Sequence, residues 1–170
     1  MTKQFRIASL ADHPHAAPVL AHWCYDAWGR DDGLTLQHEL DRFARAIDST
    51  RAGTAPLVMV ALDGDTVIGC AQLKTEQVFD FPQDTYWLGP VYIAAPYRGK
   101  DLASELIAAI VHRAQQHGVT QLYLQTEMFS GGLYSRLGWE PVFRAVTHGV
   151  EVLVMRRELC KPASASPTSA

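Results

Sequence analysis

The spacing of hydrophobic residues changes from strand-like to helical in the first third of the chain. A short run at Phe5–Leu10 predicts a strand, and two later segments with apolar residues three and four positions apart predict helices. Asp12, with Pro14 two residues later, is expected to cap the first helix, and Thr35 the second. The residues expected to face inward from these helices are Val19, Leu20, Trp23, Ala27, Leu36, Leu40, Phe43, Ala44 and Ile47.

The middle of the chain has a β-strand pattern. Leu57–Leu62 and Thr66–Leu73 are rich in apolar and β-branched residues, and the turn residues Asp63–Asp65 separate them. This arrangement predicts a β-hairpin. After a loop at 79–85, Tyr86–Ile93 predicts the next strand.

The longest predicted helix covers Arg98–His117, and Gly118 stands where a left-handed C-terminal cap belongs. Its apolar stripe consists of Leu102, Leu106, Ile107, Ile110, Val111 and Ala114. The segments that follow predict a strand, a short helix and a final hairpin, at Gln121–Thr126, Ser130–Leu137, Pro141–Thr147 and Val150–Arg156. The order of elements predicts an α/β fold with a mixed, mostly antiparallel central sheet and helices on both faces.

Length and composition fit one globular domain, which we place at residues 1–160 of the 170, with a disordered, small-residue tail at 161–170. The net charge of −3 gives no general attraction to nucleic acid or to an anionic membrane, so any anion site must be local. No apolar run approaches the roughly 20 residues that a membrane span needs, and the charged N-terminus does not fit a signal peptide. We expect the protein to be located in a reducing cytoplasm.

The cysteines and histidines do not have the spacing of a disulfide framework or a metal site. Cys24, Cys70 and Cys160 are odd in number and far apart in the sequence. His112 and His117 are five residues apart, whereas ligands on one helix face lie four apart. No metal is expected.

A basic, glycine-containing turn joins the predicted strand Tyr86–Ile93 to the longest helix. The first turn of a helix leaves backbone N–H groups unpaired and carries partial positive charge, so it can bind a diphosphate. Gly99 lets the backbone approach an anion, and Arg98 and Lys100 add positive charge. Taken alone, the turn fits an anion site and a solvated loop equally well, and Ala94 excludes the Walker pattern.

Two blocks of this sequence resemble the GNAT superfamily of N-acetyltransferases. Val91-Tyr92-Ile93 is similar to the family's strand signature, and Arg98 and Ala103 match the ends of its [QR]-x-x-G-x-[GA] element. The block Leu133–Trp139 matches the family's L-Y-x-x-x-G-[FW] element. The two blocks are about thirty residues apart with a helix and a strand between them, as the family requires. The resemblance implies the GNAT fold and acetyl-CoA as cosubstrate.

The family's central glycine is replaced by Asp101. A carboxylate should repel a pyrophosphate, although it also favours a helix N-terminus. If the side chain points to solvent, screening limits the repulsion to about 1 kcal/mol or less. If it points inward, cofactor binding is lost.

By resemblance, the strand Val91-Tyr92-Ile93 pairs with the pantetheine arm through the backbone of Val91 and Ile93. Backbone N–H groups of a six-residue turn would hold the pyrophosphate; these residues are Arg98, Gly99, Lys100, Asp101, Leu102 and Ala103. Tyr134 aligns with the tyrosine that protonates the departing thiolate. Packing against Leu133 and Trp139 is its alternative role.

The general base is not assigned by the sequence. Glu127 follows the strand Gln121–Thr126 at the end where sheet sites lie, and Glu76 ends another strand. His148 and water are further candidates. Taken singly, each carboxylate is better explained as an exposed structural residue, and His148 as a plain loop histidine. The acceptor pocket is expected among aromatic residues of the early helices and the 79–85 loop: Trp23, Trp28, Phe43, Phe79 and Phe81.

The function predicted from the sequence is transfer of an acetyl group from acetyl-CoA to a primary amine by direct attack. A small molecule is favoured over a protein as the acceptor, and loop acids (Asp26, Asp31, Asp32, Glu76, Asp80 and Asp84) favour a cationic amine. Asp101 keeps a second hypothesis open, a CoA-binding module without turnover. A phosphate-ligand protein unrelated to CoA is a third. Dimerisation is common in the family, so a homodimer also stays open.

Overall fold

A computed structural model describes residues 4–76 and 79–160. The predicted tail 161–170 lies outside these residues. The strands are β1 (Arg6–Ser9), β2 (Leu57–Asp63), β3 (Thr66–Thr75), β4 (Tyr86–Ile93), β5 (Gln121–Thr126), β6 (Glu140–Thr147) and β7 (Val150–Glu158). The helices are α1 (Ala16–Cys24), α2 (Leu36–Ala52), α3 (Leu102–Gln116) and α4 (Gly132–Arg136), with short turns η1 (Leu10–Asp12), η2 (Tyr25–Gly29) and η3 (Ala95–Tyr97).

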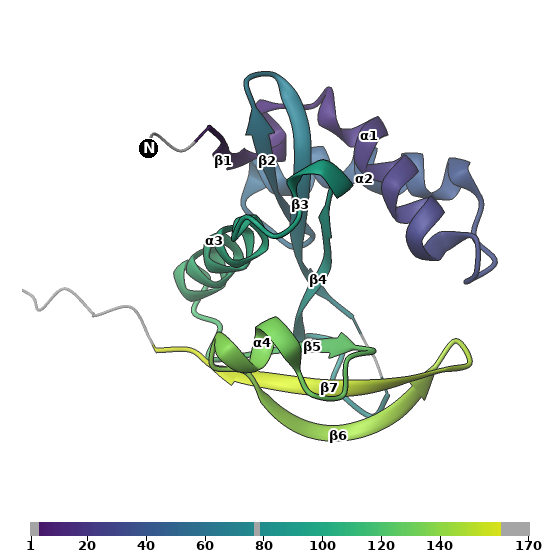
Figure 1. Ribbon diagram of the computed structural model, residues 1–170, viewed down its shortest axis with the longest axis vertical. Helices are drawn as coiled ribbons and strands as arrows, with labels where there is room; N and C mark the ends of the chain where they lie inside the picture. Colours follow the sequence, from purple (N-terminus) through teal and green to yellow (C-terminus); the bar gives the residue numbers. More distant parts are fainter. Residues whose placement is uncertain (1–3, 77–78, 161–170) are drawn as a thin grey trace, which may run out of the picture.

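The strands form one sheet in the order β1-β2-β3-β4-β5-β7-β6. All neighbouring pairs are antiparallel except β4 and β5, which are parallel. The predicted mixed, mostly antiparallel sheet is therefore confirmed. Figure 1 shows α3 on one side of this sheet and α1 and α2 on the other.

The alternation of side chains along β2 divides the core between the two faces of the sheet. Leu57, Met59 and Ala61 belong to a cluster that contains the apolar stripe of α3. Val58, Val60 and Leu62 belong to a second cluster with Leu20, Phe43 and other residues of α1 and α2. A two-sided core explains why β2 is apolar from Leu57 to Leu62 and does not alternate with polar residues.

The N-terminal boundaries predicted from sequence are partly wrong. Asp12 does not cap the first long helix; it ends the short turn η1, in which Ser9 accepts a hydrogen bond from the N–H of Ala11. The helix α1 begins four residues later, at Ala16, and no side chain caps it. Val19, predicted to face inward, is exposed, because the buried face of α1 consists of Ala16, Ala17, Leu20, Ala21 and Cys24.

Two other predicted helix ends agree with the structure. Thr35 caps α2 by accepting a hydrogen bond from the N–H of His38. Gly118 has the expected left-handed backbone, with φ of 73°. The helix predicted for Arg98–His117, however, begins at Leu102, because residues 98–101 form a separate turn. The prediction that it is the longest helix is wrong, since α3 has 15 residues and α2 has 17.

The feature that prepares the site is the separation of β4 from β5. Trp87 of β4 and Tyr123 of β5 form the one paired position between these strands. On its other edge, β4 has a bulge against β3, because Gly89 and Pro90 together oppose a single residue, Gln72. Beyond this point β4 stays paired with β3 but leaves β5, as Figure 1 shows.

Candidate active site

The edge of β4 that faces away from β3 carries backbone groups of two residues predicted to contact the cofactor. Ala94 donates its N–H to Ile68 on β3, over 2.9 Å. Because backbone groups of alternate residues point to opposite edges of a strand, those of Val91 and Ile93 face the β5 side. The carbonyl oxygen of Ile93 accepts a hydrogen bond from Nε of Arg98, over 2.9 Å.

The turn before α3 presents a row of backbone N–H groups. Within the described residues, the N–H groups of 99–104 have no hydrogen-bond acceptor, and the first bond of α3 runs from Glu105 to Asp101. Gly99 has φ of 76° and Asp101 has φ of 60°, so the turn contains two left-handed residues. Alternating backbone of this kind forms a concave group of N–H donors suited to an anion.

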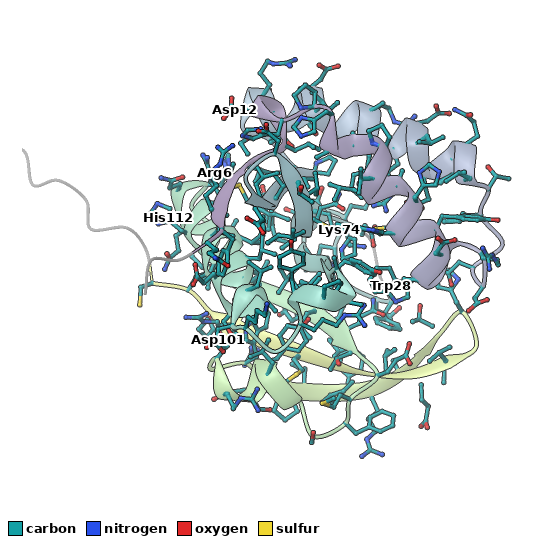
Figure 2. All side chains as sticks on the ribbon, turned by 45° about the horizontal axis from the view of Figure 1, so that its top comes forward. Arg6, Asp12, Trp28, Lys74, Asp101 and His112 are labelled. Carbon is teal, nitrogen blue, oxygen red and sulfur yellow. The ribbon has the colours of Figure 1, made fainter. Side chains whose placement is uncertain are left out.

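The Asp101 side chain is exposed and does not bond to the helix N-terminus. The residue itself has a left-handed backbone conformation, which glycine adopts easily and which aspartate tolerates better than most residues. This explains how aspartate can stand at the family's glycine position without changing the turn. In Figure 2, Asp101 lies at the surface of the molecule.

The same turn is tied to the β2–β3 hairpin through Tyr97. Its hydroxyl donates a hydrogen bond to Oδ2 of Asp63, over 3.0 Å. This bond is the main reason why the pKa of Tyr97 is raised. The Lys100 ammonium lies 5.5 Å from the Tyr97 ring. The contact with Asp63 anchors the turn independently of any ligand.

A cleft of about 1070 Å³ lies beside β4 and reaches from Leu88–Val91 to the end of β5. Its opposite walls come from the segment between α1 and α2 and from the β6–β7 hairpin. Trp28 of η2 and Lys74 of β3, both labelled in Figure 2, line it from two different elements. Of the nine predicted cofactor contacts, Val91 lines this cleft, whereas Tyr92, Ile93 and the six residues of the turn 98–103 lie outside its lining.

Tyr134 lines the cleft from α4. Its ring is 6.2 Å from that of Trp139, and its hydroxyl has no hydrogen-bond partner within the part of the chain that the structure describes. Burial raises the pKa of Tyr134, so the phenol is protonated at neutral pH. The arrangement contains both predicted features, aromatic packing and a hydroxyl next to the cleft.

The candidate bases all line the same cleft, but they differ in their contacts. Glu76 pairs with Lys74 over 2.9 Å. His148 Nδ1 lies 3.9 Å from Oδ1 of Asp32, so two distant loops meet at the rim. Glu127 is exposed and has no side-chain partner among residues 4–76 and 79–160.

Two of the five aromatic residues predicted for the acceptor pocket line the cleft, and three do not. Trp28 and Phe79 line the cleft. Trp23 stacks on Tyr92, with ring centroids 4.9 Å apart. The other two are packed elsewhere: Phe43 is 1% exposed, and Phe81 contacts Trp87 and Tyr123.

A sequence profile of the acetyltransferase (GNAT) family matches residues 18–139, well over half of the chain. The chain belongs to this family. Comparison with curated proteins finds no match.

Three solved structures share the GNAT fold of this chain. A protein from Acinetobacter baylyi described as an acetyltransferase has a TM-score of 0.74 at 18% identity, over 98% of this chain and 99% of its own. A second, from Salmonella typhimurium with its cofactor acetyl-CoA, has a TM-score of 0.68 at 19% identity, over 97% and 99%. The ribosomal-protein-alanine N-acetyltransferase from Brucella melitensis has 0.67 at 22%, over 91% and 99%.

Sequence reasoning missed a buried polar cluster in this GNAT domain. Glu39 and Gln72 are each 3% exposed, and both contact Arg42. A signal was present, since Glu39 has the inward spacing of Leu36 and Phe43 on α2. The cluster was missed because only apolar residues were assigned to that face.

Among the described residues, no group of three or more His, Cys, Asp or Glu side chains could hold a metal ion. A search of the same residues finds no helix long and apolar enough to cross a membrane.

Proposed function

We propose that this GNAT protein transfers the acetyl group of acetyl-CoA to a primary amine. The observation that carries the proposal is that Tyr134 lines a cleft that includes Val91 and that its hydroxyl has no hydrogen-bond partner in the described chain. Burial also raises the pKa of this phenol. A phenol with a raised pKa is a suitable proton donor to a thiolate that leaves at neutral pH.

The donors on this chain match the acceptors on acetyl-CoA. Val91 and Ile93 would pair with the amides of the pantetheine arm, like an added strand. The unpaired N–H groups of 99–103 would hold the pyrophosphate, with Arg98 and Lys100 supplying charge. A similarly folded protein has acetyl-CoA as its cofactor, which supports acetyl-CoA as the cosubstrate here.

Two side chains would move protons in the reaction. The amine attacks the thioester carbonyl, and Glu127, directly or through water, accepts the proton that the amine loses. As the carbon–sulfur bond breaks, Tyr134 donates its proton to the CoA sulfur. Glu127 is favoured over Glu76 because Lys74 already pairs with the Glu76 carboxylate.

A second candidate is a CoA-binding module without turnover. The Asp101 carboxylate next to the predicted pyrophosphate site favours it, and so does the Arg98 side chain bonded to Ile93 on the predicted pantetheine edge. Both features would weaken binding without interfering with the fold.

The test is release of free thiol from acetyl-CoA with a panel of primary amines, compared between the wild-type protein and Tyr134→Phe. Amine-dependent release that falls at least about a hundredfold in the variant supports the enzyme. Measurable CoA binding without turnover for any amine supports the module. A protein that CoA does not stabilise against heat contradicts both candidates.

A further inference from the structure

The inner wall of the cleft contains an ion pair in which the carboxylate is buried and the guanidinium is partly exposed. Glu39 and Arg42 lie three residues apart on α2, and both line the cleft. Nε and Nη2 of Arg42 donate to the same oxygen of Glu39, Oε2, with Nε at 3.0 Å. Nη1 donates to Oε1 of Gln72 on β3, over 3.2 Å.

Arg42 has hydrogen-bonding capacity that its neighbours do not use. A guanidinium has five N–H bonds, and three of them go to Glu39 and Gln72. A further one lies near the Cys24 sulfur, which is a weak acceptor. At least one N–H therefore has no partner in the described residues, on a side chain that is 27% exposed and borders the cleft.

A purely structural role does not account well for this pair. Buried ion pairs are often no more stabilising than apolar residues of similar volume. The neighbouring inward positions of α2 are apolar, with Phe43 and Ala46 almost fully buried. A fixed guanidinium at the wall of an open cleft is suited to ligand recognition, because its planar donors are already oriented.

We propose that Arg42 anchors the acceptor through a carboxylate or carbonyl oxygen, so that the substrates are amines that also carry such an oxygen. The inference rests on the proposed function and names its substrate class. Glu39 balances the charge of Arg42, which makes a charged and a neutral oxygen both acceptable there. Glu127 and Tyr134, which line the same cleft, would face the amine.

The experiment uses matched acceptors that differ at the proposed anchor, with rates compared per mole of neutral amine because the neighbouring group also changes the pKa of the amine. One set is phenylalanine, phenylalaninamide and phenethylamine, and the second is leucine, leucinamide and 3-methylbutylamine. We expect the oxygen-bearing members to exceed the decarboxylated amine by about tenfold or more in kcat/KM at saturating acetyl-CoA. Turnover of all three at similar rates overturns the anchor but leaves the proposed function intact. Absence of turnover with every amine overturns both.

Variants connect the preference to the ion pair. Glu39→Gln keeps a hydrogen-bonding partner but leaves Arg42 with an unbalanced charge, so the carboxylate should gain over the amide by severalfold. The double variant Glu39→Gln with Arg42→Gln should lose the preference and raise the KM of the acceptor about tenfold, with the KM of acetyl-CoA unchanged. Its melting temperature shows whether it is folded.

The matched control is Arg45→Gln, an exposed arginine on the same helix. It should leave both the preference and the KM values unchanged. An unchanged preference in folded Glu39→Gln overturns the assignment. Equal effects of Arg45→Gln and of the double variant Glu39→Gln with Arg42→Gln overturn it too.

Discussion

The Arg98 side chain donates a hydrogen bond from Nε to the carbonyl oxygen of Ile93, over 2.9 Å, on the edge of β4 that β5 has left. The guanidinium also lies 5.6 Å from the Tyr92 ring. Arg98 thus contacts one of the two predicted pantetheine partners and stands next to the predicted pyrophosphate site. Its charge and its hydrogen bond can be separated by substitution.

Arg98→Gln should weaken CoA binding about tenfold at low salt, because a phosphate contact from a cation is lost. Arg98→Lys keeps the charge and should stay within about twofold of the wild type. Isothermal titration calorimetry at two salt concentrations measures both. Equal affinities for the wild type and Arg98→Gln would mean that the arginine does not contact a phosphate.

Asp101 can be tested for charge and for backbone conformation. Asp101→Asn removes the charge and still tolerates the left-handed backbone, and Asp101→Gly adopts it freely. Both should bind acetyl-CoA more tightly, by up to about fivefold at low salt. Asp101→Ala should gain affinity too, but lose about 1 kcal/mol of folding stability because alanine disfavours this backbone.

Calorimetric titration and urea unfolding separate these two effects. Unchanged affinity in Asp101→Asn would place the carboxylate away from the pyrophosphate.

The raised pKa of Tyr134 fixes where the phenol can lose its proton. Because the folded pKa lies above the ordinary value, the phenol stays protonated below pH 10 and its deprotonation begins only at higher pH. The turnover number should therefore show no Tyr134-dependent decline between pH 7 and 9.5. The stability that the buried neutral phenol contributes is likewise present below the unfolded pKa and lost as the pH rises through the folded one. A decline of kcat near pH 8.5 that disappears in Tyr134→Phe would contradict this.

Glu127 and Glu76 provide a paired test of the general base. Glu127→Gln should lower kcat by about a hundredfold at neutral pH, whereas Glu76→Gln should have less than a threefold effect because Lys74 already pairs with its carboxylate. Steady-state kinetics with one responsive amine is sufficient. The opposite order would move the base to Glu76, and two small effects would leave water as the proton acceptor.

The three thiols should react at very different rates. Cys160 is exposed, whereas Cys24 and Cys70 are 3% and 1% exposed. The hydrogen bond with Cys70 lowers the pKa of Cys24, but burial limits the access of a bulky reagent. With an aromatic disulfide reagent we expect one fast thiol in the native protein and three after unfolding. The native Cys160→Ser variant should have no fast-reacting thiol. A second fast thiol would show that Cys24 is reached through the cleft.

The parts of the fold that local chemistry determines were predictable from sequence. The β2–β3 hairpin follows from a turn between two apolar runs, and Thr35 and Gly118 mark helix ends through side-chain and backbone preferences. Asp12 misled the prediction because a good capping residue was followed by a short turn, not by the helix itself. Residue propensities alone cannot distinguish a short turn such as η1 from the first turn of the helix α1.

The site was predictable where motifs define it and not where tertiary contacts do. The family motifs located Tyr134 and the turn 98–103, but nothing local to β4 shows that it leaves β5 after Trp87. The Glu39–Arg42 pair depends on Gln72, which is thirty residues away from Arg42 in the chain. The meeting of Asp32 with His148 likewise needs the folded arrangement of two loops.

The separation of β4 from β5 also has a mechanical consequence. Four strands on one side and three on the other share a single paired position, and α3 packs against both parts through one hydrophobic cluster. The sheet therefore has fewer hydrogen bonds between β4 and β5 than between its other neighbouring strands, and the contacts of α3 help to hold the two parts together. A molecule that bonds along β4 and also contacts α4 would connect the two parts of the sheet. Its binding would restrict their motion relative to each other.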